Sequence, residues 1–288
     1  MSIIQEIKGR TFVSDWMPAP IEMPEGHCEI VVGDSHGYEK TLRRVVSEGL
    51  SINPDAHLTF TGDVISRGPN SMGALKFALG ITHERKGRGT FLYGNHEIAL
   101  LGHLAGVKAF DPIVEKHGGW LHYDYKISRK LLRSALEKGL GSAAYNLFTR
   151  DGLMWSDRIK SSMKDVLYRS IGNVVMVHAG IPGHLRKRRD VMRYLKKMKP
   201  YDMNGTHPLW LKSGFLDSDH DYDGLVVIHG HTIESKIPTD DGFRPVGQHF
   251  FDRYRIGVDA GSYLTGMIAG VMLRNGQYRY ITAKDYDF

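Results

Sequence analysis

Three short apolar runs in the first third of the chain each end at a glycine, and a helical pattern follows each run. The runs and their glycines are 29–32 with Gly33, 58–61 with Gly62, and 90–93 with Gly94. β-Branched and aromatic residues are frequent in these runs, which is typical of buried strands. Apolar residues at helical spacing follow the first run, between Leu42 and Leu50. This alternation of strand and helix predicts an α/β fold with a largely parallel sheet.

The second half of the chain predicts further strands. Apolar runs at 174–177 and 225–228 end at histidines, and both have the length of a buried strand. From 255 to 283 the pattern is β throughout, and the pair Asn275-Gly276 indicates a tight hairpin. We therefore expect the C-terminal stretch to add antiparallel strands to the α/β beginning.

The chain of 288 residues is long enough for one large domain. No internal repeat or low-complexity linker divides it, so we expect a single domain over 1–288. A less regular helical region is expected at about 104–170, where the spacing of apolar residues from 131 to 136 indicates one helix.

Cysteine content and hydropathy indicate the cellular compartment of such a chain. Cys28 is the only cysteine, so no disulfide can form within the chain, which is usual in a reducing compartment. No apolar run reaches the 18 residues of a membrane-spanning helix. The first 18 residues also lack the apolar core of a secretory signal. The sequence therefore predicts a cytoplasmic protein that has no membrane partner.

The charge balance favours anionic partners. Lys and Arg number 38 against 32 Asp and Glu, which gives a net charge of +6. Part of the excess is local, in the run from Arg186 to Arg189 and at the lysines that follow it. Such a cluster is either a solvated helix face or a surface that binds phosphates or nucleic acid.

Polar clusters stand directly after the predicted strands. They are Gly33-Asp34-Ser35-His36-Gly37, Gly62-Asp63, Gly94-Asn95-His96-Glu97, His178-Ala179-Gly180 and Gly230-His231-Thr232. Ligands bind at the carboxyl ends of strands in α/β sheets, so we expect these loops to converge. Carboxylate and amide oxygens suit hard cations, and imidazole suits zinc and iron. One such cluster alone could be a turn or a helix cap, but five together predict a metal site.

The order GDSHG, GDVISRG, GNHE, VHAG, HGHT resembles the calcineurin-like metallophosphoesterases. More narrowly, it is similar to the bacterial branch of the phosphoprotein phosphatases. The resemblance runs from about Ile30 to Ile281, and the Asp-x-Gly at Asp259 is similar to the closing strand of the family. It implies a β-sandwich flanked by helices, with a two-metal site at the carboxyl ends of the strands.

The resemblance also implies which residues hold the metals. One ion would be held by Asp34, His36 and Asp63, and the other by Asp63, Asn95, His178 and His231, so that Asp63 bridges the two. The ligand of the HGHT motif is its second histidine, so His229 would lie behind the ligands. The implied cofactors are two divalent ions, with manganese expected first and iron or zinc as alternatives.

The catalytic roles follow from the same resemblance. Arg67 would bind the phosphate, because a guanidinium matches two phosphate oxygens at once. His96 would protonate the leaving oxygen as a general acid. Lys212 would stand where the family has a second arginine, and is otherwise a surface lysine. The implied activity is that of a hydrolase similar to phosphoserine and phosphothreonine phosphatases, acting on phosphoproteins or small phosphomonoesters by direct attack of metal-activated water.

One departure leaves the substrate open. The protein phosphatases read Gly-Asp-x-Val-Asp-Arg-Gly, whereas this chain has Ser66 where they have the second aspartate. Without that carboxylate, His96 is expected to hold its proton less tightly. The symmetrical diadenosine tetraphosphate hydrolases also lack it and continue as Arg-Gly-Pro, as this chain does, so that activity is the alternative. A second alternative is an anion- or nucleic-acid-binding protein with a vestigial metal site, which an intact ligand set makes less favoured.

Overall fold

The computed structural model describes residues 11–104, 107–117, 167–233, 238–239, 242–243 and 254–285. The helix expected at 131–136, and most of the less regular region expected at 104–170, lie outside the described residues. Within the described ranges, no helix combines the length and the apolar character needed to cross a membrane.

The first sheet contains the three strands predicted from the glycine-terminated runs. Its order is β1-β13-β12-β3-β4-β5, and β2 pairs with β13 at one side. The bounds are β1 Thr11–Val13, β2 Met17–Pro18, β3 Glu29–Val32, β4 His57–Phe60, β5 Gly89–Phe91, β12 Met267–Arg274 and β13 Gln277–Lys284. Strands β3, β4 and β5 are parallel, whereas β12 and β13 form the expected antiparallel hairpin around Asn275-Gly276.

The second sheet has the order β11-β8-β7-β6. Its bounds are β6 Tyr168–Ile171, β7 Val174–Val177, β8 Val226–His229 and β11 Arg255–Gly257. The expectation that the C-terminal stretch adds only antiparallel strands is wrong for β11, which pairs in parallel with β8. A short helix, α10 (Ser262–Thr265), also interrupts the stretch that was expected to be β throughout. Strands β9 (Pro238–Thr239) and β10 (Gly242–Phe243) pair with each other.

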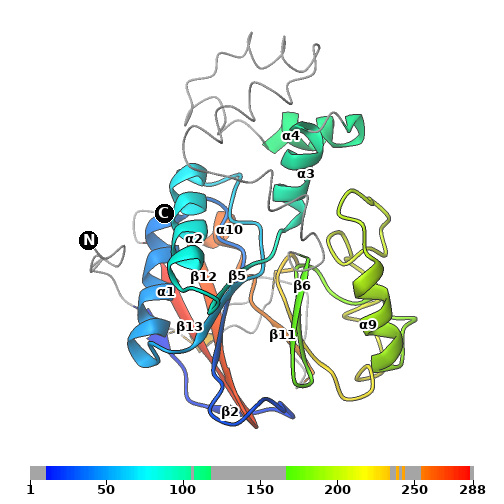
Figure 1. Ribbon diagram of the computed structural model, residues 1–288. Coiled ribbons are helices and arrows are strands. Elements are labelled where there is room, and N and C mark those ends of the chain that lie inside the picture. The colour runs from blue at the N-terminus through cyan, green and yellow to red at the C-terminus, as the bar shows by residue number, and fades with distance from the viewer. Residues whose placement is uncertain are drawn as a thin grey trace.

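Helices cover the outer faces of both sheets (Figure 1). The first half of the chain forms the helices α1 Glu39–Ile52, α2 Ser71–Glu84, α3 Asn95–Leu104 and α4 Asp111–His117 and the 3-10 turn η1 Lys108–Phe110, of which α3 and α4 lie beyond the end of the sheets (Figure 1). Helices α1 and α2 pack on the first sheet, and α9 (Arg188–Lys197) packs on the second through Val191 and Leu195. Helix α2 begins two residues after Pro69, because the Asn70 side chain caps it by accepting the Gly73 N–H. The basic run from Arg186 to Arg189 is exposed where α9 begins.

One core lies between the first sheet and its helices, and a second lies between the two sheets. Strand β3 shows how the period-two alternation builds both: Ile30 and Val32 face the helices, whereas Val31 faces the second sheet. Val31 there joins Val271 of β12 and, from the second sheet, Met176 and Ile228. The molecule is thus a β-sandwich flanked by helices, as the sequence motifs imply.

Candidate metal centre

The polar loops that follow β3, β4, β7 and β8, together with the first turn of α3, meet at one edge of the sandwich. Asp63 stands at the centre of this cluster. Its carboxylate oxygens lie 3.8 Å from His36 Nε2, 3.9 Å from His96 Nε2 and 3.6 Å from His178 Nε2. Asn95 completes the cluster, with its Oδ1 2.9 Å from His178 Nε2 and 3.0 Å from His231 Nδ1. All of these side chains are buried except that of His231, which is partly buried.

Two glycines let the loops approach this closely. A Cβ at Gly94 would lie 2.2 Å from Asp63 Oδ1 and 2.4 Å from the Asp63 nitrogen. A Cβ at Gly33 would lie 1.9 Å from the carbonyl oxygen of Val258, which belongs to the loop after β11. Any larger residue would push these loops apart, which explains why glycine ends these strands.

The loops hold several residues in the left-handed backbone region that glycine normally occupies. The φ angles are 42° at His36, 50° at Asp63, 76° at Ser66, 70° at Arg67 and 64° at His231. Such conformations persist only where the surrounding structure enforces them, and they concentrate at functional sites.

Glu97 holds the loop that follows β4 in this backbone conformation. Its carboxylate accepts four backbone N–H groups, those of Asp63 at 2.7 Å, Val64 at 2.8 Å, Ile65 at 3.2 Å and Gly94 at 2.9 Å. Burial, with the nearby Asp63 carboxylate as the second cause, raises the pKa of Glu97 to about 7. Sequence reasoning gave Glu97 no role, although it ends the GNHE motif.

The histidines present lone pairs toward the centre. His178 Nδ1 lies 2.9 Å from the carbonyl oxygen of Thr61, so this nitrogen carries the proton. Burial lowers the pKa of His178 to about 4, so the ring is neutral at pH 7 and has only one N–H. Its Nε2 lone pair therefore faces the Asn95 and Asp63 oxygens, which also carry lone pairs. A cation bound among these atoms would attract all of these lone pairs and so remove the repulsion between them.

His36 repeats this arrangement on the other side of Asp63. Its Nδ1 lies 3.0 Å from the carbonyl oxygen of Ile65, which leaves Nε2 to face the Asp63 carboxylate. Burial, followed by the charge of Arg67, lowers the pKa of His36 to about 3. Metal-ligating histidines commonly donate their other N–H to a backbone carbonyl in this way.

Three buried carboxyl groups lie near one another in the same region. Burial, and then the neighbouring Asp259 and Asp63, raises the pKa of Asp34 well above its ordinary value. Burial likewise raises the pKa of Asp63 to about 7 and that of Asp259 to about 6. Asp34 Oδ2 accepts the His231 N–H at 3.0 Å, whereas Oδ1 is buried and has no hydrogen-bond partner within the described ranges. Acids gathered in this way fit a site for divalent cations.

The donor atoms fall into two groups that share Asp63. One group is His36, Asp63 and His96, and the other is Asp63, His178 and His231, with the ligand atoms of each group within 4.8 Å of one another. The predicted ligand residues therefore lie together, with Asp63 common to both groups. His96, to which the sequence motifs gave a catalytic role, joins the first of these groups, and Asp34 stands beside the second through its hydrogen bond from the His231 N–H. Asp259, which lies beside Asp34, was not predicted as a site residue, although the sequence places it in an Asp-x-Gly motif.

His229 does not face this centre. Its Nδ1 lies 3.1 Å from the carbonyl oxygen of Gly230, and its ring packs edge-on against Phe215 at 5.1 Å between centroids. His231 lies in the ligand group, as expected, and His229 lies outside it.

Two cations border the centre. Arg67 is exposed, and its guanidinium lies 4.0 Å above the centroid of the Tyr263 ring, which itself meets His36 edge-on. Lys212 is also exposed, and it helps to lower the pKa of His231, after burial and the neighbouring His178. Lys212 is thus close enough to act on the centre electrostatically. Tyr263, which comes from α10, was not predicted.

His96 is buried, with the mostly apolar side chains of a small cavity beside it. Burial, followed by His36 and Arg67, lowers its pKa well below the ordinary value. Its ring lies 5.1 Å from that of His117, a neighbour that the sequence did not predict. Ser66 lines the same small cavity as His96. The residue that stands in place of the phosphatases' second aspartate therefore lies beside the histidine that this aspartate would support.

The family model for the calcineurin-like phosphoesterases matches residues 30–254. This match covers most of the chain, which therefore belongs to that family. The buried Asp and His cluster is the part of the chain suited to divalent ions.

Curated relatives match over a shorter stretch. The chain is 32% identical over 82 residues to a symmetrical bis(5'-nucleosyl)-tetraphosphatase of Glaesserella parasuis, covering 28% of this chain and 29% of the relative. It is 33% identical over 85 residues to the corresponding protein of Proteus mirabilis, with coverage of 28% and 29%. The matches thus span less than a third of the length of these relatives.

Solved structures share the fold over nearly the whole chain. A cold-active protein-tyrosine phosphatase from a Shewanella species aligns with a TM-score of 0.51 at 18% identity, over 88% of this chain and 77% of its own. A protein serine/threonine phosphatase from Saccharomyces cerevisiae aligns with a TM-score of 0.52 at 14% identity, over 92% and 82%. At these identities the likeness shows the fold alone.

Proposed function

We propose that the chain hydrolyses phosphomonoesters with the help of two divalent ions held at the candidate metal centre. The proposed ligands are Asp34, His36, Asp63, Asn95, His178 and His231, with Asp63 shared. The observation that carries the proposal is the set of neutral histidines whose lone pairs face oxygen atoms across the centre. Manganese is the first expectation from the family resemblance, and iron or zinc would also suit a set that mixes oxygen and imidazole donors.

Bound divalent ions supply two things: a water of lowered pKa, and positive charge at the phosphoryl oxygens. The protein's own residues supply the rest. Arg67 would bind the non-bridging oxygens, because its guanidinium is exposed beside the centre and is steadied by Tyr263. Lys212 would add a second positive charge near His231.

His96 would assist the leaving group. As the P–O bond to the leaving oxygen breaks and water adds to phosphorus, the leaving oxygen needs a proton or a hydrogen bond. A neutral imidazole still has one N–H, so His96 can donate a hydrogen bond even though its pKa is low. We place this role on His96 because it lies beside Asp63 yet forms part of the wall of a cavity.

A second candidate substrate is a symmetrical dinucleoside tetraphosphate. Two observations favour it: the curated relatives carry that activity in their names, and Ser66 stands beside His96 where protein phosphatases have an aspartate. A nucleoside diphosphate is a better leaving group than a serine hydroxyl, so its departure depends less on a strong acid.

A substrate panel separates the two candidates. The wild-type chain would be assayed with Mn²⁺ on p-nitrophenyl phosphate, a phosphoserine peptide, a phosphotyrosine peptide and diadenosine tetraphosphate. We expect the phosphomonoesters to be hydrolysed, and a chelator or Asp63→Asn to remove the activity. If diadenosine tetraphosphate is cleaved to two molecules of ADP with a higher kcat/KM than any monoester, the second candidate is correct. If none of the four is cleaved, the proposed function is wrong.

A further inference from the structure

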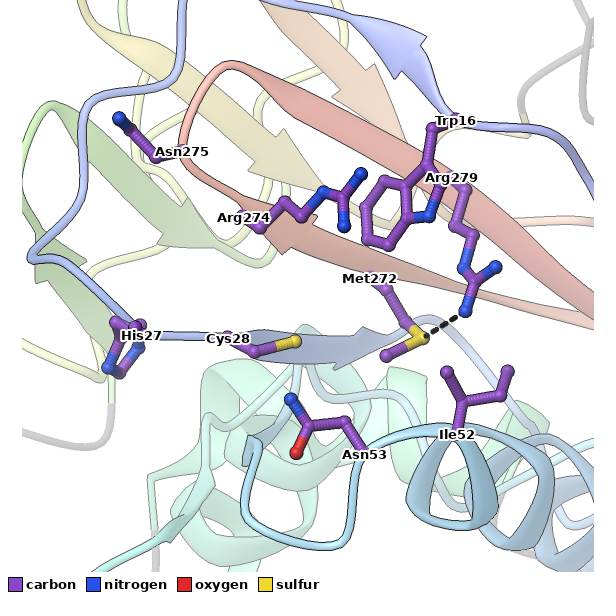
Figure 2. A pocket seen from close by; sticks show the side chains of 10 residues that line it. Trp16, His27, Cys28, Ile52, Asn53, Met272, Arg274, Asn275 and Arg279 are labelled. Atoms are coloured by element: carbon purple, nitrogen blue, oxygen red, sulfur yellow. Dashed lines mark hydrogen bonds between the residues drawn. The ribbon is translucent and has the colours of Figure 1, made fainter.

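A cavity of about 410 Å³ lies at the end of the first sheet that is opposite the candidate metal centre (Figure 2). Cys28, which directly precedes β3, lines one side, and Asn53, at the C-terminal end of α1, lines another. Arg274 and Arg279 enter it from the β12–β13 hairpin. The cavity is large enough for a small ligand, and nothing in the proposed reaction uses it.

The guanidinium groups of two arginines lie over the ring of Trp16 in this cavity. The guanidinium carbons of Arg274 and Arg279 lie 3.9 Å and 4.5 Å from the centroid of the Trp16 ring. Arg274 donates to the amide oxygen of Gln277 at 2.9 Å, and Arg279 donates to Met272 Sδ at 3.8 Å. Both acceptors are neutral, and within the part of the chain that the structure describes neither arginine forms an ion pair within 4.0 Å.

Arg279 gives the clearest evidence that the described lining of the cavity lacks a negative charge to balance its arginines. Its Nε is buried and has no hydrogen-bond partner among the described residues. Burial, and next the like charge of Arg274, lowers its pKa. The Glu48 carboxylate acts on it only from a distance and accepts its own hydrogen bond from Thr11. An anion in the cavity would be attracted by both guanidinium groups, with two planar forks available to hold it.

Much of the remaining wall is apolar, although His27, Asn53 and Asn275 also line the cavity. Met272, the Trp16 ring, Ile52 and the Cys28 thiol line it, and burial raises the pKa of that thiol, so it is uncharged at neutral pH. A bare inorganic ion would leave this surface in contact with water. We propose that the cavity binds a small organic anion, in which a phosphate or carboxylate group is attached to an apolar body.

The single cysteine provides a specific test. Cys28 is the only cysteine in the chain, so alkylation by N-ethylmaleimide at pH 7.5, where maleimides react with thiols rather than amines, followed by the mass of the peptide that contains Cys28, reports on this cavity. We expect phenylphosphonate, which cannot be hydrolysed, to slow alkylation at least about fivefold at saturation. Benzoate tests whether a carboxylate serves equally well. Inorganic phosphate should protect less, and neutral benzyl alcohol should not protect.

Arginine variants complete the test. Arg274→Gln changes an exposed hairpin residue, and we expect it to raise the phenylphosphonate concentration for half protection at least tenfold. Arg193→Gln, an exposed change on α9, should leave that concentration unchanged. The proposal is overturned if phenylphosphonate gives no protection, or gives equal protection in Arg274→Gln. If the thiol fails to react, titration calorimetry with phenylphosphonate decides instead: the binding event must persist in Arg67→Gln and disappear in Arg274→Gln.

Discussion

The two ends of strand β3 carry buried carboxylates whose pKa values move in opposite directions. Glu29, at the beginning, is fully buried, yet its pKa is lowered, because hydrogen bonds from His27 and Arg169 outweigh the effect of burial. Asp34, just beyond the other end, has its pKa raised well above the ordinary value by burial and by neighbouring acids. The Arg169 side chain reaches Glu29 from β6 of the second sheet, at 3.0 Å.

This difference separates a structural charge from a functional one. At the first end the fold supplies its own cation, and the pair joins the two sheets. At the second end the fold gathers acids and histidine lone pairs, and its cations Arg67 and Lys212 stand only at the exposed border. This is the arrangement expected where a cation comes from solution. The predictions below test this division between the two ends.

Asp63→Asn should have the largest effect. It removes the one carboxylate shared by both ligand groups, so each ion would lose a negatively charged donor. We expect a loss of activity of more than about 10³-fold, on the order seen when a key electrostatic group is removed, together with lower metal content. Near-normal turnover and metal content in this variant would contradict the bridging role.

His96→Asn should have the next largest effect and should depend on the substrate. Loss of a general acid typically costs about 10²- to 10⁴-fold, and the loss should be greater for a phosphoserine peptide than for p-nitrophenyl phosphate. The metal content should stay at the wild-type value. If instead the ions are lost, His96 is a ligand, as its position in the group with His36 and Asp63 would allow.

Arg169→Gln tests the structural end of β3. Leaving Glu29 buried without its main cation should lower the free energy of unfolding by about 3 kcal/mol at pH 7. Because the folded pKa of Glu29 is below its ordinary value of 4.5, the stabilisation it provides is complete above that pH and is lost as the pH falls through the folded pKa. The difference from wild type, measured by urea unfolding, should therefore narrow below pH 4.5.

The matched control for this variant is Arg186→Gln. Arg186 pairs with Asp219 at 3.3 Å, but both side chains are more than half exposed. We expect this change to cost less than about 1 kcal/mol at any pH. An equal loss of unfolding free energy in Arg169→Gln and Arg186→Gln would mean that burial does not strengthen the pair between Glu29 and Arg169.

Tyr263→Leu should have the smallest effect. It removes the ring beneath the Arg67 guanidinium, a contact worth about 0.5–1 kcal/mol at exposed sites. A two- to fivefold fall in kcat/KM is expected, chiefly through KM, whereas Tyr263→Phe should behave as wild type. A fall in kcat alone, or an equal effect in Tyr263→Phe, would show that the ring does not act by positioning Arg67.

Periodicity predicted the strands and helices that carry the site, because β3, β4, β7, β8 and α1 bury continuous apolar faces. The convergence of the loops followed from the rule that parallel strands end at one edge. The direction of β11 could not be predicted, since three residues contain no information on which strand they pair with. Glu97 was missed because three of its four partners are backbone N–H groups more than thirty residues away. Arg169 was missed for the same reason, as it lies on another sheet.

The central claim is that the end of β3 near Asp34 holds two divalent ions. Its most direct test is the metal content of the chain after dialysis against Mn²⁺, measured by inorganic mass spectrometry in wild type, Asp63→Asn and Arg169→Gln. The account predicts two ions per chain in wild type and in Arg169→Gln, and fewer in Asp63→Asn. One ion or none in the wild-type chain, or the same content in all three proteins, would contradict it.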